Sequence, residues 1–87
     1  KQKVIFLSTI SQSFIIVDID IEKRAMELEK LNFSSFDSLH IACAERGNAD
    51  ILLTTDDNLL RKALQNKSIL QVRVENPVKW LMEEIEK

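Results

Sequence analysis

The chain has 87 residues, enough for one modest hydrophobic core and too few for two independent domains. Hydrophobic residues make up 45% and charged residues 30% of the sequence, a balance typical of a globular protein and not of a disordered tail. The sequence has 1 Gly and 1 Pro, which indicates long regular elements with tight connections and argues against an all-β fold.

The charges nearly cancel, because 12 Lys and Arg stand against 14 Asp and Glu, for a formal net charge of -2. A global positive field that would bind nucleic acid is therefore excluded, and any such contact has to be local. Cys43 is the single cysteine, no stretch is long and apolar enough for a membrane span, and the start lacks a signal-peptide pattern. We expect a reduced, cytoplasmic protein without a membrane partner.

The first elements are predicted from hydrophobic spacing. Val4, Leu7 and Ile10 recur three apart, which predicts a helix over residues 2–12. Residues 14–17 form a continuous apolar run, which is typical of a strand covered on both faces. We expect a helix and then a buried strand in this part of the chain.

Two helices are predicted next. The first runs over residues 20–31 with Asp20 as its N-cap. The second runs over residues 36–46, is small or apolar nearly all round, and is capped by Ser34 or Ser35. Gly47 is expected to end it.

The second half of the chain alternates strands and helices. We expect strands over residues 51–53 and 69–74, the latter at a sheet edge, and helices over residues 57–65 and from Asn76-Pro77 to residue 86. Helices between strands call for a mostly parallel sheet with helices on its faces. The predicted fold class is α/β, with three α/β/α layers and a short, mostly parallel sheet.

Two carboxylates are predicted to meet at one edge of this sheet. The helix that begins near Asp37 runs antiparallel to the strand that ends before Asp56, so the helix start and the strand end share an edge. We expect the two carboxylates within about 4–8 Å of each other, as one hydrated Mg²⁺ or Mn²⁺ would require. The alternative is purely structural, since Asp is common in first helical turns and at N-caps.

The segments FDSLHIACA (36–44) and ADILLTTDDNLL (49–60) closely resemble the C-terminal half of PIN domains. These are metal-dependent ribonucleases that include the toxins of many bacterial toxin-antitoxin pairs. The resemblance covers residues 14–77. Asp37 matches the third acidic residue of the family, and Asp56 matches the fourth, in its Thr-x-Asp segment. The family's first Asp, on an opening strand, and its Glu, on an early helix, have no counterpart here, so both would precede Lys1.

The resemblance implies that residues 1–87 are the C-terminal part of a single PIN-like domain, incomplete at the N-terminus. The parent domain would be an endoribonuclease that hydrolyses RNA phosphodiesters with Mg²⁺ or Mn²⁺, with Asp37 and Asp56 as catalytic residues and metal ligands. An antitoxin protein would be a possible partner. With two of the expected acids absent, these 87 residues alone should be nearly inactive.

Other residues near this edge have supporting roles in the prediction. His40 follows Asp37 on the same helix face and is either a further ligand or a residue that packs beside the site. Thr54 and Thr55 either orient the Asp56 carboxylate or simply close the strand, and Asp57 is an N-cap candidate beside it. Arg61 and Lys62 either contact RNA phosphates or belong to a solvated helix face, and the solvated face is favoured. Trp80, with Leu81 and Ile85, is expected to be a core anchor of the last helix in preference to a base-stacking platform.

A second function of another class is a non-catalytic α/β interaction module. It would use an exposed sheet edge to pair with a partner or a second copy. A homo-oligomer is expected in either case, held by apolar surface from Val4, Ile5 and Leu7 and by the sheet edge. An upstream strand ending in Asp, followed by a Glu on a helix, would favour the enzyme.

Overall fold

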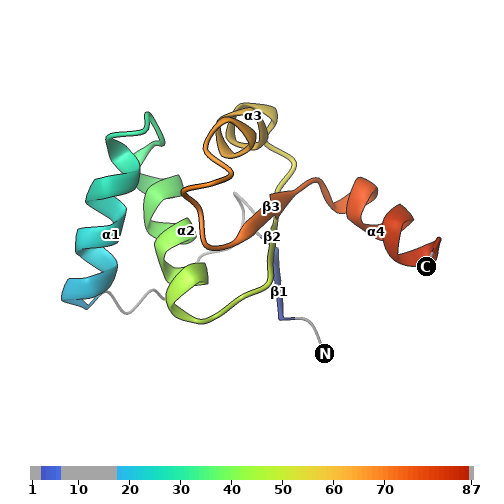
Figure 1. The fold of residues 1–87 in the computed structure, drawn as a ribbon, viewed down its shortest axis with the longest axis horizontal. Helices are drawn as coiled ribbons and strands as arrows, with labels where there is room; N and C mark the ends of the chain where they lie inside the picture. The colour runs from blue at the N-terminus through green and yellow to red at the C-terminus, as the bar shows by residue number, and fades with distance from the viewer. Residues whose placement is uncertain (1–2, 7–17, 87) are drawn as a thin grey trace.

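The computed structural model describes residues 3–6 and 18–86. In chain order the elements are β1 (Val4–Phe6), α1 (Ile19–Glu29), α2 (Ser35–Arg46), β2 (Ile51–Leu53), α3 (Asp57–Gln65), β3 (Arg73–Glu75) and α4 (Pro77–Ile85) (Figure 1). This arrangement confirms the predicted small α/β fold with helices around a parallel sheet.

The sheet has the order β1-β2-β3, and both neighbouring pairs are parallel. The central strand, β2, is buried at all three of its positions, as its continuous apolar run predicts. Leu52 pairs with Ile5 on one side and with Val74 on the other. β2 therefore joins both edges of the sheet to the core.

The helix predicted over residues 2–12 is wrong where the structure describes it, because Val4–Phe6 form β1. The backbone N–H of Lys3 donates to Asp50 Oδ2 at 2.7 Å, and its Nζ donates to the carbonyl of Gly47 at 2.8 Å. These contacts align β1 with β2, so pairing across 47 positions outweighs the local spacing of Val4 and its neighbours. The rest of that range and the strand predicted over residues 14–17 lie outside the described residues.

The helices begin at side-chain caps. Asp18, and not Asp20, caps α1 by accepting the N–H of Ile21 at 2.9 Å. Ser34 caps α2, as predicted, and Gly47 follows that helix with φ -81°. The left-handed residue of this turn is Asn48, with φ 56°, a conformation that Asn tolerates better than most residues.

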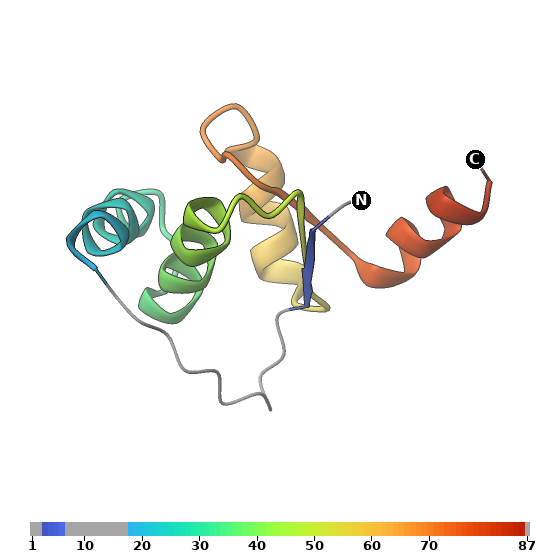
Figure 2. The ribbon, with the colours of Figure 1, turned by 90° about the horizontal axis from the view of Figure 1, so that it is seen from below.

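The core lies where α1, α2 and α3 meet the central strand. Leu28, Ile41 and Leu52 have no exposed surface, and Leu59 is 1% exposed. Each such side chain contributes roughly 1.5–3 kcal/mol when fully buried. α1 and α2 form a pair on one side of the sheet (Figures 1 and 2), and their packing holds the N-terminal turn of α2 in place.

The last strand begins later than the predicted residues 69–74, because the chain turns before it. The N–H groups of Ile69 and Leu70 both donate to the carbonyl of Asn66, and the paired residues are Arg73–Glu75. β3 is an edge strand, as predicted. The register of the sheet thus depends on a turn that hydrophobic alternation does not reveal.

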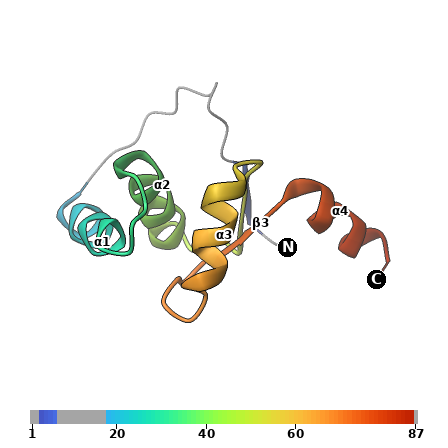
Figure 3. The same ribbon diagram turned by 90° about the horizontal axis from the view of Figure 1, so that it is seen from above.

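α4 projects away from the other helices (Figure 3). None of its residues is buried, and Leu81 and Ile85 are 52% and 73% exposed. The prediction of these two residues as a core anchor with Trp80 is therefore wrong, since the helix points away from the core that they would fill. Trp80 itself is half-buried.

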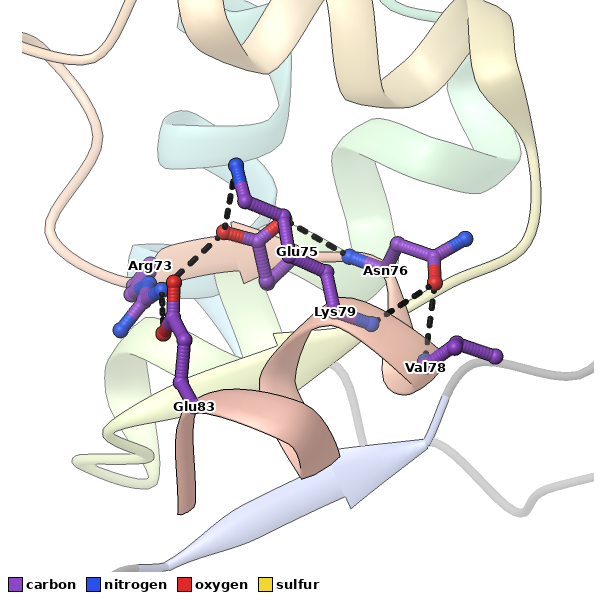
Figure 4. A network of polar contacts seen from close by, with 6 residues as sticks. All are labelled: Arg73, Glu75, Asn76, Val78, Lys79 and Glu83. Carbon is purple, nitrogen blue, oxygen red and sulfur yellow. Dashed lines mark hydrogen bonds and ion pairs between the residues drawn. The ribbon is translucent and has the colours of Figure 1, made fainter. Parts of the chain in front are cut away.

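Polar contacts attach α4 to β3 (Figure 4). Arg73 donates to Glu83 at 2.7 Å and to Glu75 at 3.1 Å, and Lys79 Nζ lies 4.0 Å from Glu75. Hydrogen bonds to Glu83 and Glu75 raise the pKa of Arg73. Burial alone would raise the pKa of Glu75, but the hydrogen bond from the N–H of Asn76 and the neighbouring cations lower it overall. The charged forms of Arg73 and Glu75 are thus favoured.

Candidate functional site

The start of α2 and the end of β2 lie at the same end of the molecule (Figure 1). α2 runs toward a short turn, from which β2 returns in the opposite direction. The Nζ of Lys62 on α3 donates to the carbonyl of Asn32, in the turn before α2, at 2.7 Å. This bond ties α3, which follows Asp56, to the segment that leads into Asp37. The start of α2 and the end of β2 thus share one end of the molecule, and the separation of about 4–8 Å between the carboxylates of Asp37 and Asp56 stays a prediction.

Asp37 lies in the first turn of α2. Its backbone N–H donates to Ser34 Oγ at 3.1 Å, so the cap fixes the backbone and leaves the carboxylate out of the capping. The side chain is half-buried, and its carboxylate accepts no hydrogen bond from any residue in ranges 3–6 and 18–86. Among the described residues, none therefore competes with a ligand for the oxygens of Asp37.

Asp56 is the N-cap of α3. Its Oδ1 accepts the N–H groups of Asn58 at 2.9 Å and of Leu59 at 3.2 Å. Within the described part of the chain no hydrogen bond goes to Oδ2. One oxygen therefore holds the helix start while the other remains for a cation, and the capping and ligand roles of Asp56 are compatible.

The threonines before Asp56 differ from each other. Thr54 is 3% exposed, and its Oγ1 accepts the backbone N–H of Asp56 at 3.1 Å. It thus fixes the Asp56 backbone. The sequence leaves open whether Thr54 orients the carboxylate or closes the strand, and the hydrogen bond to its Oγ1 comes from the backbone. Thr55 is exposed. Asp57, the predicted N-cap candidate, is also exposed and is the first residue of α3, whereas Asp56 is the residue that caps this helix.

His40 packs against an aromatic neighbour on its own helix. The rings of Phe36 and His40 are tilted by 49°, with centroids 4.3 Å apart. Burial lowers the pKa of His40, although the charge of Asp37 raises it. The imidazole is therefore neutral at physiological pH and lies beside Asp37. The contact was missed from the sequence, although the spacing of four residues on a helix was its signal.

The polar cluster farther along α2 is separate from this edge. Arg24 Nε donates to Glu45 at 2.7 Å, and this bond raises the pKa of Arg24. The cluster borders an open pocket of about 490 Å³. The residues that line it are Asp20, Ile21, Arg24, Ala42, Glu45, Arg46, Asn48 and Gln71. Neither Asp37 nor Asp56 lines this pocket, so we attribute the cluster to packing of the turn before β3.

Cys43 and Arg61 also have partners or surroundings that favour structural roles. Cys43 is half-buried, and burial, with the charge of Asp18, raises the pKa of its thiol. Arg61 donates to the side chain of Asn58 one turn earlier on α3. Cys43 is therefore not an activated nucleophile, and Arg61 lies on an exposed face of α3 with one hydrogen bond to a neutral neighbour.

The donor set suits a hard divalent ion that keeps most of its water. In ranges 3–6 and 18–86 no group of three or more His, Cys, Asp or Glu converges on one metal position. Mg²⁺ is commonly held by one or two carboxylates with water completing its shell, so the side chains of Asp37 and Asp56 are of the type that could hold it. The neutral His40 is a poorer match to Mg²⁺ than an oxygen ligand.

A family model of the PIN domain matches residues 4–64. The chain belongs to the PIN domain family. The match contains both Asp37 and Asp56 and begins at β1, so this PIN domain segment includes more of the N-terminal side than the resemblance from residue 14 predicts. PIN domains are generally nucleases that act on RNA and typically use divalent metals.

Comparisons with curated proteins and with solved structures returned no match to this PIN domain chain. Among the residues that the structure describes, no helix has the length and hydropathy needed to cross a membrane. The family assignment therefore depends on the family model and agrees with the α/β fold.

Proposed function

We propose that this PIN domain chain is part of an endoribonuclease that hydrolyses RNA phosphodiesters with Mg²⁺ or Mn²⁺. The observation that supports the proposal best is the pair Asp37 and Asp56, whose backbones are fixed by caps at one end of the sheet while carboxylate oxygens remain unbonded to described residues. The family match over both residues adds a nuclease context.

In this proposal each residue at the edge has a defined task. Asp37 and Asp56 would hold the divalent ion, whose chemistry there would be to lower the pKa of water, so that the water loses a proton more easily and becomes a better nucleophile toward the phosphodiester. Thr54 holds the Asp56 backbone, and Ser34 holds that of Asp37. The neutral His40 adds no positive charge that would compete with the ion for the Asp37 carboxylate.

Metal binding can be tested on the 87-residue chain without an activity assay. Titration with Mn²⁺, followed by the loss of its free-ion EPR signal, should show weak binding that Asp37→Asn and Asp56→Asn each reduce at least about tenfold. Asn is as good an N-cap as Asp, so Asp56→Asn removes the charge while keeping α3 intact. Asp20→Asn, on α1, is the matched control and should leave binding unchanged.

Activity needs a longer chain, since we propose that residues upstream of Lys1 supply the family's first Asp and its Glu. The 87-residue chain should cleave single-stranded RNA weakly or not at all, and the extended chain should cleave it with Mg²⁺. Loss of cleavage in extended Asp37→Asn and Asp56→Asn would support the assignment. An extended Asp56→Asn enzyme with full activity would contradict it.

The proposed partners are RNA, an antitoxin protein and a second copy of the chain, in the cytoplasm. Two surfaces favour a protein partner. Val78, Met82 and Ile85 on α4 are 66%, 57% and 73% exposed, and β1 lies at an edge of the sheet that the described residues form, with Val4 37% exposed. The first helix predicted at the oligomer contact is absent at Val4, so we now assign that contact to the β1 edge and α4.

These surfaces also fit the alternative function, a non-catalytic interaction module. In that case the chain should associate and bind a protein while metal binding is unaffected by Asp37→Asn. Light scattering over a dilution series, combined with the Mn²⁺ titration, separates the two functions, because the module predicts association without a metal site.

A further inference from the structure

We propose that Phe36 is a stacking platform for an unpaired nucleobase of the RNA substrate, with His40 supporting its ring. The proposal rests on the proposed nuclease function and names the feature of RNA that the site selects. It assigns to Phe36 a positioning role in substrate binding that the metal chemistry of the acidic pair does not require.

The exposure and position of Phe36 are the first argument. Its side chain is 50% exposed, although it belongs to the α2 helix whose Ile41 and Ala44 are almost fully buried. It directly precedes Asp37, in the first turn of α2. The phenyl ring is outside the buried core, and His40, which it contacts, also interacts with the charge of Asp37.

The second argument is that the ring is supported from within the protein. The His40 imidazole packs against Phe36 with a centroid separation of 4.3 Å, and His40 is itself half-buried. This contact restricts the Phe36 ring while leaving much of its surface in solvent. A restricted, exposed aromatic ring loses little entropy when a base stacks on it.

The third argument is electrostatic. The chain has a net charge of -2, and Asp37 and Asp56 add local negative charge at the sheet edge. Phosphates are repelled from such an edge unless a cation is bound, so charge alone cannot hold RNA there. Base stacking is nearly independent of charge and tolerates any base, because every base has a π-face. Stacking on Phe36 would therefore supply local affinity for RNA that the net charge of the chain does not supply.

Stacking also explains which RNA would be chosen. A base can lie flat on Phe36 only when it has left its own stack, which is easy in single strands and costly in a duplex. Phenyl has no hydrogen-bonding group, so Phe36 selects unpaired bases and not a sequence. The inferred substrate is a single-stranded or looped RNA segment.

The test measures binding of the 87-residue chain, in Mg²⁺, to two fluorescent ligands of equal length. One is a short oligouridylate, and the other is the same ribose-phosphate backbone without bases. Phe36→Ala should weaken binding of oligouridylate about 5- to 100-fold and leave the abasic ligand unchanged. Phe36→Trp should bind oligouridylate as wild type does, and Leu64→Ala, which removes an apolar side chain that is 72% exposed, should have no effect.

His40 provides a second readout, because it is the single histidine and its ring Cε1–H signal needs no assignment. Oligouridylate should shift this NMR signal, and the abasic ligand should not. Equal binding of oligouridylate by wild type and Phe36→Ala overturns the proposal. So does an equal loss on both ligands, which would mark a structural defect, or no measurable binding of oligouridylate by wild type.

Failure of the stacking proposal differs from failure of the proposed function. If Phe36→Ala binds oligouridylate normally while extended Asp37→Asn loses cleavage, the stacking role is wrong and the nuclease assignment stands. If extended Asp37→Asn still cleaves RNA, the acidic site is wrong whatever Phe36 does. The stacking role is also wrong if Phe36 contacts a protein partner and RNA binding does not change in Phe36→Ala.

Discussion

Replacing Glu45 by Ala should destabilise the fold more than any exposed charge change. The Glu45 side chain is 4% exposed, and it accepts hydrogen bonds from Arg24 Nε at 2.7 Å, Arg24 Nη2 at 3.1 Å and the N–H of Gln71 at 2.8 Å. Together these bonds join α1, α2 and the turn that leads into β3. Removal of the carboxylate leaves the Arg24 charge and the Gln71 N–H without this acceptor.

The magnitude follows from burial. Removal of one member of a buried ion pair costs about 3–5 kcal/mol. Arg24 is 21% exposed and keeps the carbonyl of Ile69 at 2.9 Å and the exposed Glu27 as partners, so the lower end of that range, about 3 kcal/mol, applies. The total stability of a chain of this size is roughly 4–13 kcal/mol. Glu45→Ala should therefore remove a large share of it.

Urea unfolding followed by circular dichroism measures this loss. With a slope of about 1–2 kcal/mol per molar urea, Glu45→Ala should lower the midpoint by about 1.5–3 M. Glu27 is 65% exposed, and Glu27→Ala should cost no more than about 1 kcal/mol. If Glu45→Ala shows no cooperative transition, Glu45→Gln can be measured in its place, because Gln keeps the size and one acceptor oxygen. The expected loss of unfolding free energy for Glu45→Gln is about 1–2 kcal/mol. Equal losses for Glu45→Ala and Glu27→Ala would refute the reasoning.

Two further predictions concern a titration and a helix cap. Burial lowers the pKa of His40 below its usual value of 6.5, so Asp37→Asn, which removes a charge that raises it, should lower it further. As the pH falls, His40 is protonated at a higher pH in the unfolded chain than in the folded one, so stability should fall from about pH 6.5 down through the folded pKa. An NMR titration that shows a raised pKa for His40 would contradict this prediction. Asn76 Oδ1 accepts the N–H groups of Val78 at 2.8 Å and Lys79 at 3.2 Å, so Asn76→Ala should weaken α4 by about 1 kcal/mol. Hydrogen exchange should accelerate in α4 but not in α2, whereas Asn76→Asp should keep the cap, and equal acceleration in both helices would count against a local effect.

The buried elements could be predicted from the sequence because their local signals and their packing agree. α2 and β2 are apolar on more than one side, and each ends near the predicted residue. The caps Ser34 and Asn76 have side chains whose chemistry determines where a helix begins. The expectation that Asp37 and Asp56 share an edge followed from these directions alone, and the course of α2 and β2 bears out the shared edge (Figure 1).

The errors occur where distant contacts decide the conformation. Three apolar residues at the start have helical spacing, yet Val4–Phe6 pair with a strand almost fifty positions away. No local pattern contains that information. α4 has an apolar stripe that normally indicates a buried face, but the charged contacts of Arg73 and Glu83 hold it against β3 with the stripe exposed. Periodicity predicts which face is apolar and cannot predict what covers it.

Asp56 has a structural role as well as a proposed ligand role, so replacing it by Ala cannot distinguish the two. Asp56 Oδ1 stabilises the start of α3, so Asp56→Ala would remove a cap worth about 1 kcal/mol as well as a proposed ligand. Any loss of activity in that variant would be ambiguous. Asp56→Asn keeps an acceptor for the N–H groups of Asn58 and Leu59 and removes only the charge. Unchanged unfolding together with lost Mn²⁺ binding in Asp56→Asn would therefore assign the Asp56 charge to the site, because its contribution to folding would be intact.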